Sequence, residues 1–140
     1  MKVKKIDVQN AVNALGRVPV NKVKNDQIRN TLIYDYRRLR KVSREIEQER
    51  TDLIEKFRED FADEMLDVQV LRASGRPVID HDEFLRAEAS SNRLISEMFQ
   101  EEVTEDLDLQ KVPMDDFVKA VRDGDYTFED LACLDGIVID

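Results

Sequence analysis

Apolar positions recur with a helical period along the longest stretch of the chain that contains neither glycine nor proline. Within it Leu32, Leu39, Ile46 and Leu53 recur every seven residues. The pattern predicts one long amphipathic helix over about residues 25–66. Such a helix would be roughly 60 Å long at ~1.5 Å per residue, which is longer than a domain of this size is wide.

The apolar stripe of this helix is a candidate interaction seam. Ser43 and Arg50 occupy heptad positions that a two-stranded coiled coil fills with apolar side chains. The pattern therefore favours an antiparallel helical hairpin, or a helix packed on its own domain, over a parallel zipper. We expect the seam to be buried against a partner helix. Its members are Leu32, Tyr36, Leu39, Ile46, Leu53 and Phe57.

Shorter elements flank the long helix. Residues 2–6, 105–112 and 136–140 alternate in polarity or are apolar, which predicts three short strands. Helices are expected over about 8–15, 83–100, 114–122 and from Thr127, which has a capping-box spacing to Asp130.

The predicted fold is therefore α+β and mostly helical, with one long helix, shorter helices and a small sheet of about three short strands. Residues 1–140 are expected to form a single domain, with a turn at 72–79 and a compact C-terminal part at about 80–140.

Composition adds a charge asymmetry to this picture. The net charge is −9, but residues 1–58 carry 15 basic and 8 acidic side chains, whereas residues 59–140 carry 7 basic and 23 acidic ones. Such polarity can hold the two halves together, align neighbouring copies head to tail, or steer a charged partner. The chain has no apolar run of membrane-spanning length, no signal-peptide pattern and one cysteine, so we expect a cytoplasmic protein without membrane contact.

The sequence lacks the residue patterns of catalytic and metal sites. The one histidine, His81, has no further ligands at zinc or iron spacing, and the Asp123–Leu134 segment lacks the glycine and terminal glutamate of a calcium loop. No glycine-rich loop could hold a phosphate. We expect no catalytic residues, no metal site, no cofactor and no small-molecule substrate, and therefore no enzyme.

A basic patch lies on the predicted long helix. Glutamates at 45, 47 and 49 follow it directly, the whole chain is acidic, and few aromatic residues are available for base stacking. These features favour a solvated face or a contact with the acidic half of the chain, ahead of an acidic protein partner and of nucleic acid. The patch consists of Arg37, Arg38, Arg40, Lys41 and Arg44.

Four segments carry a resemblance to a known group of proteins: "IDVQNAVNALG" (6–16), "RRLRKVSREIEQERTDLIEKF" (37–57), "GRPV" (75–78) and "YTFEDLACLDGIVI" (126–139). In their order they resemble a small family of uncharacterised proteins encoded by tailed phages of Gram-positive bacteria. The resemblance implies phage origin, a location in the host-cell cytoplasm or the virion, and a non-enzymatic role.

The leading functional hypothesis is a phage-type protein–protein interaction protein, a virion-assembly or structural accessory that binds a protein partner or forms a homo-oligomer through its long helix. An acidic inhibitor of a host nuclease, defence or regulatory protein is the first alternative. A nucleic-acid-binding accessory that uses the basic stripe at 37–44 is the second.

Overall fold

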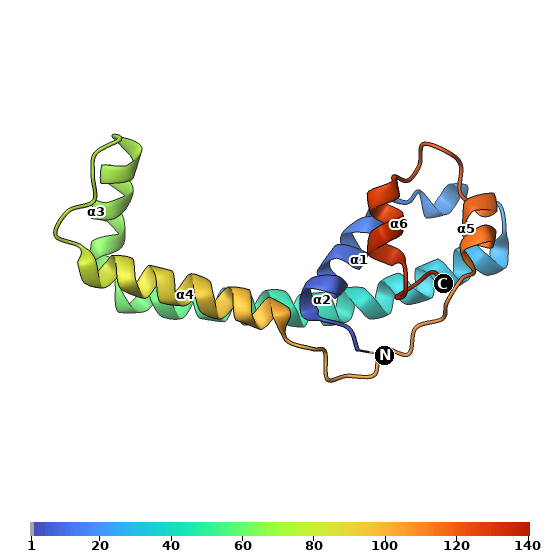
Figure 1. The fold of residues 1–140 in the computed structure, drawn as a ribbon, viewed down its shortest axis with the longest axis horizontal. Helices are drawn as coiled ribbons and strands as arrows, with labels where there is room; N and C mark the ends of the chain where they lie inside the picture. The colour runs from blue at the N-terminus through green and yellow to red at the C-terminus, as the bar shows by residue number, and fades with distance from the viewer. Residues whose placement is uncertain (1) are drawn as a thin grey trace. The chain divides into compact units, whose positions relative to one another are not determined.

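The computed structural model describes residues 2–140, which form two compact units (Figure 1). Unit 1 combines the residues up to Ile46 with Gln100–Asp140, and unit 2 comprises Glu47–Phe99. The long helix α2 (Asp26–Asp60) contributes to both units.

The described residues form six α-helices and a short 3-10 turn, with no strand among them, so the prediction of an α+β fold was wrong. The elements are α1 (Lys5–Arg17), the 3-10 turn (Val20–Lys22), α2 (Asp26–Asp60), α3 (Ala62–Ala73), α4 (Asp82–Gln100), α5 (Met114–Ala120) and α6 (Phe128–Leu134).

The segments predicted as strands form isolated bridges instead. Near the N-terminus, α1 already begins at Lys5, and Lys4 makes a single antiparallel bridge with Glu102. Near the C-terminus, the Val112 N–H donates to the Val138 carbonyl at 2.8 Å, and Ile139 makes isolated parallel bridges with Val112 and with Asp135. Alternating polarity specifies which side of an extended segment is buried, whereas a sheet also requires neighbouring strands to share a ladder of hydrogen bonds. Leu107 and Leu109, which the alternation places on one side, are buried and partly buried, but they do not pair in a strand.

The core of unit 1 lies where α1 and α6 run side by side (Figure 1). The inner face of α1 carries small or β-branched side chains, Val8, Ala11 and Ala14, which are fully buried and allow close packing. The predicted capping box of α6 is confirmed. Thr127 and Asp130 exchange hydrogen bonds of 3.0 and 3.1 Å between side chain and backbone, which satisfies two N–H groups at the helix start.

Opposite charges from the two halves of the sequence meet within unit 1. The Lys5–Glu101 pair is 2.8 Å apart and the Arg38–Asp108 pair 3.3 Å apart, while Arg17 donates from Nε to Asp130 at 2.9 Å. The charge asymmetry of the sequence is thus partly matched inside the chain.

Unit 2 is built on three phenylalanine rings. Phe57, Phe61 and Phe84 lie with ring centroids 5.2–5.7 Å apart, a distance at which tilted and edge-to-face rings attract. At Phe61 the backbone leaves helical geometry (φ −129°, ψ 31°), so α2 ends at Asp60 rather than near residue 66, and α3 begins at Ala62. No glycine or proline marks this break. The contact of Phe61 with Phe84 accompanies it, and tertiary packing of this kind routinely overrides helix propensity.

A bidentate ion pair between Arg72 and Glu88 connects α3 with α4. Both terminal nitrogens of Arg72 donate to the carboxylate of Glu88, at 2.9 and 2.7 Å. This pairing lowers the pKa of Glu88 and raises that of Arg72. Unit 2 is therefore a hairpin of α2 and α4 with α3 attached at the end where Phe84 lies.

Candidate functional site

The structure divides the predicted seam between the two units. Leu32, Leu39 and Ile46 are buried in unit 1, at 0%, 0% and 2% exposure, so the chain itself covers them. Tyr36 is only partly buried. Leu53 and Phe57 belong to unit 2, where they are partly exposed. The seam therefore remains partly accessible to another molecule at Tyr36 in unit 1 and at Leu53 and Phe57 in unit 2.

Asp35 is a buried carboxylate that the sequence analysis missed. Its exposure is 0%, its Oδ1 accepts a hydrogen bond from the Gln110 backbone N–H at 2.8 Å, and its Oδ2 accepts none from any described residue. Burial raises the pKa of Asp35 to about 6, although the Gln110 hydrogen bond and the charge of Arg38 act in the opposite direction.

The sequence did hold a signal for this burial. Asp35 lies three residues after Leu32 and four before Leu39, so it falls on the apolar stripe of the helix. The buried stripe runs through Asp35 and Val42 rather than through Tyr36 and Ser43. Asp35 therefore lies on the buried side of α2, where its carboxylate links this helix to the segment around Gln110 by a hydrogen bond.

The basic patch is exposed along its whole length, at Arg37, Arg38, Arg40, Lys41 and Arg44. Two of its members are engaged by side chains of unit 1. The Arg38 guanidinium lies 4.9 Å from the centre of the Tyr34 ring and pairs with Asp108, and the Arg40 guanidinium lies 6.0 Å from the Tyr36 ring. These contacts orient part of the patch along the helix surface.

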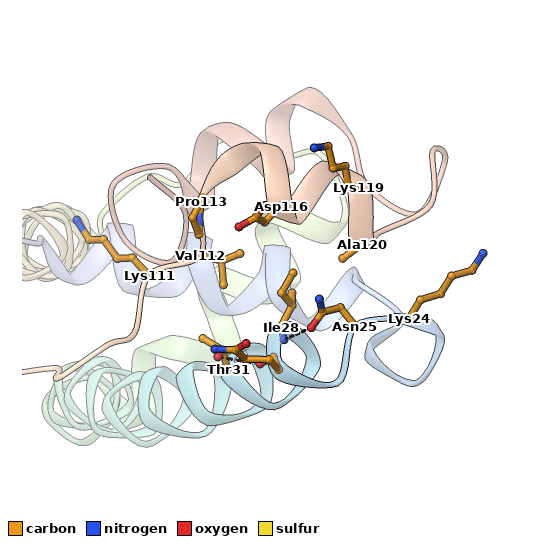
Figure 2. A pocket seen from close by; sticks show the side chains of 11 residues that line it. Lys24, Asn25, Ile28, Thr31, Lys111, Val112, Pro113, Asp116, Lys119 and Ala120 are labelled. Carbon is orange, nitrogen blue, oxygen red and sulfur yellow. Dashed lines mark hydrogen bonds between the residues drawn. The ribbon is translucent and has the colours of Figure 1, made fainter.

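Unit 1 also contains an open hollow of about 520 Å³ between the first turns of α2 and α5 (Figure 2). Lys24, Lys111 and Lys119 line it, but Figure 2 shows the amino groups of Lys24 and Lys111 extending away from the hollow and from each other. The Asn25 side chain accepts a hydrogen bond from the Ile28 N–H, and the Thr31 hydroxyl donates to a backbone carbonyl. Of the polar residues that line the hollow, Lys24 and Lys111 thus extend outward, while Asn25 and Thr31 are hydrogen-bonded to the backbone at the start of α2.

Among residues 2–140 no group of three potential ligands could hold a metal ion. His81 instead lies directly before α4, where its Nδ1 is 3.0 Å from the Glu64 carboxylate. Within the same range, no helix is both long and apolar enough to cross a bilayer.

Unit 2 carries an apolar groove between α2 and α4. Its volume is about 180 Å³. Leu53, Phe57 and Phe61 line it from one side, and its α4 side combines Leu94, which is 45% exposed, with small side chains. Lys56 and Asp60 also line it. The residues that line this α2–α4 groove are Leu53, Lys56, Phe57, Asp60, Phe61, Ala87, Ser90, Ser91 and Leu94.

Exposed apolar side chains gather in the same unit. In the described part of the chain, six large apolar residues are exposed, and four of them belong to unit 2: Leu66, Val70, Ile79 and Leu94. Leu66 and Val70 lie four residues apart on α3, and adjacent exposed apolar residues mark an interaction surface more often than scattered single residues do.

Comparison of the chain with protein-family models, with curated proteins and with solved structures finds no match.

Proposed function

We propose that this chain is a non-enzymatic protein–protein interaction protein that pairs with a second copy of itself through the α2–α4 groove. The observation that carries the proposal is the open apolar groove in unit 2, where Leu53, Phe57 and Leu94 remain accessible. A pair of helices with an apolar side left open gains stability when further helices cover that side, as in a four-helix bundle.

The α4 side of the groove is suited to a close helix contact. Ala87, Ser90 and Ser91 follow one another at intervals of three and one residues, and Leu94 continues the same side one turn later. Small side chains shorten the distance between two packed helices, which lets a helix from another molecule reach the phenylalanines that line the groove.

The two charged residues that line the groove favour a second copy over a strongly charged partner. Lys56 and Asp60 lie one helical turn apart on α2 and have opposite signs. In a two-fold symmetric interface a contact from one residue to a second is repeated from the second to the first. Lys56 of one copy can therefore lie against Asp60 of the other, and Asp60 of the first against Lys56 of the second. A helix with a single sign of charge would instead meet one like charge in the groove.

A self-associating protein of this kind fits the virion-assembly or structural-accessory role of the leading functional hypothesis. In this role the exposed surfaces of unit 1 would remain available to further components of the assembly.

The experiment is a mass measurement on two matched variants by sedimentation equilibrium. Leu94→Glu places a charge in the groove, and Val118→Glu makes the same kind of change at an exposed residue of α5 in unit 1. We expect Leu94→Glu to give the 16.3 kDa monomer and Val118→Glu to keep twice that mass. An unchanged mass for Leu94→Glu, with circular dichroism like that of the wild type, would refute the groove as the pairing surface.

A further inference from the structure

Helix α3 has apolar side chains on two opposite faces. Its inner face contributes Val68, which is 1% exposed, and Leu71, which is partly buried. Its outer face carries Leu66 and Val70, which are 67% and 59% exposed. Ala62 and Ala73 are exposed on the same face, at helical spacings of four and three residues from them.

Such a helix is expected to be covered on both sides, because an exposed helix of a globular protein usually keeps its apolar residues on one face. Contacts within unit 2 account for the inner face alone. The Phe61–Phe84 ring pair and the Arg72–Glu88 ion pair hold α3 against α4, while Leu66 and Val70 stay in solvent. The outer face therefore needs a partner that the α2–α4 groove does not provide.

The charges around the outer face define that partner. Asp63 and Asp67 are exposed on the flank of the Leu66–Val70 stripe. Between residues 59 and 83 the chain has eight acidic and two basic side chains, and one of the two basic ones, Arg72, is already paired with Glu88. A second copy of α3 would bring the aspartates of both copies together, which is unfavourable.

We infer that the outer face of α3 binds a cationic amphipathic helix of a partner protein. The apolar side of that helix would cover Leu66 and Val70, and its lysines or arginines would lie beside Asp63 and Asp67, in the helix-on-helix mode of peptide recognition. This surface is separate from the groove proposed for self-association, so the two proposals stand or fall independently.

The test uses a fluorescent synthetic peptide of about 18 residues, or about five helical turns, with leucines at helical spacing and lysines at the other positions. A matched peptide carries glutamate in place of every lysine. Binding to the full-length protein is followed by fluorescence anisotropy at low and high salt. We expect the lysine peptide to bind, its affinity to fall with salt, and the glutamate peptide to bind at least ~tenfold more weakly.

Two double variants locate the contact. Leu66→Ser with Val70→Ser should weaken the lysine peptide by ~tenfold or more, because two apolar contacts are lost. Asp63→Asn with Asp67→Asn should weaken it several-fold at low salt and little at high salt. All four positions are exposed, so the fold should persist, which circular dichroism checks. Val118→Ser with Asp115→Asn on α5 is the matched control and should leave affinity unchanged.

The inference is overturned if the α3 variants bind the lysine peptide as the wild type does, or if the glutamate peptide binds equally well. It is also overturned if the protein binds phosphatidylcholine–phosphatidylglycerol vesicles through Leu66 and Val70, because the surface would then serve lipid. The α3 variants should keep the dimer mass and Leu94→Glu should keep peptide binding, so the failure of either proposal can be recognised separately.

Discussion

Replacement of Asp35 by asparagine should stabilise the protein at neutral pH. The carboxylate is fully buried and has one hydrogen bond, from Gln110, so its ionised form is poorly compensated. Asparagine has nearly the same shape, its Oδ1 can accept the Gln110 hydrogen bond, and it carries no charge.

The magnitude follows from the pKa of Asp35, which is raised from 3.8 to about 6 in the folded protein. At ~1.4 kcal/mol per pKa unit, the ionised carboxylate costs the folded state roughly 3 kcal/mol relative to the protonated one. An amide nitrogen without a partner at the Oδ2 position would offset about 1 kcal/mol or more of the gain. We therefore expect Asp35→Asn to raise the free energy of unfolding by ~1–2 kcal/mol at pH 7.

The raised pKa also determines how the contribution of Asp35 to the free energy of unfolding changes with pH. The raised pKa means that the folded protein binds the proton more tightly, so the contribution of Asp35 to stability is most favourable below about pH 4 and is lost as the pH rises through about 6. The difference between Asp35→Asn and the wild type should accordingly grow between about pH 4 and 7.

The assay is urea unfolding followed by circular dichroism across that pH range, with Asp115→Asn as the control. Asp115 is an exposed aspartate on α5 in the same unit. A difference between Asp35→Asn and the wild type that does not change with pH, or a less stable variant at pH 7, would refute this account of Asp35.

Three further variants test the packing and electrostatics of the units. Leu39→Ala should lower the free energy of unfolding by ~2–5 kcal/mol in urea titrations, because it opens a cavity at a fully buried position; a loss below ~1 kcal/mol would contradict its place in the core. Phe84→Ala removes the centre of the ring cluster, so amide hydrogen exchange should accelerate in unit 2 and stay slow in α1; equal acceleration in both would show that the units do not open separately. Burial acts to raise the pKa of Asp130, but hydrogen bonds from Arg17 and Thr127 outweigh it and lower the pKa. Asp130→Asn should therefore reduce the melting temperature at pH 7 and have progressively less effect as the pH falls below about 4. A reduction of equal size at about pH 3 would argue against this ionic contribution.

The helical part of the fold could be predicted from local signals. A 3.6-residue period, the absence of breakers and the Thr127–Asp130 capping box placed α1, α4, α5, α6 and most of α2 close to where they lie, because these signals reside within single segments. Helix α3 was not predicted as a separate helix. The strands were wrong because alternation at 105–112 reports burial alone. The end of α2 at Asp60 could not be found from local signals, because Phe61 packs on Phe84 from a distant segment.

Only the α2 side of the candidate groove could be predicted from the sequence. Leu53 and Phe57 belong to the predicted seam, but the α4 residues opposite them follow from the pairing of two helices, which a single stripe does not specify. The stripe also did not distinguish residues that the chain covers itself, such as Leu32 and Leu39, from those left open. The exposed apolar face of α3 was not predicted, because residues 62–66 were assigned to the long helix.

The measurement that tests the central claim most directly is the mass of the wild-type protein by light scattering after size exclusion, at about 50 mM and about 1 M salt. Pairing through the apolar α2–α4 groove predicts twice 16.3 kDa in both conditions, because burial of Leu53, Phe57 and Leu94 is not screened by salt. A 16.3 kDa monomer in both conditions, at protein concentrations well above the micromolar range, would contradict it.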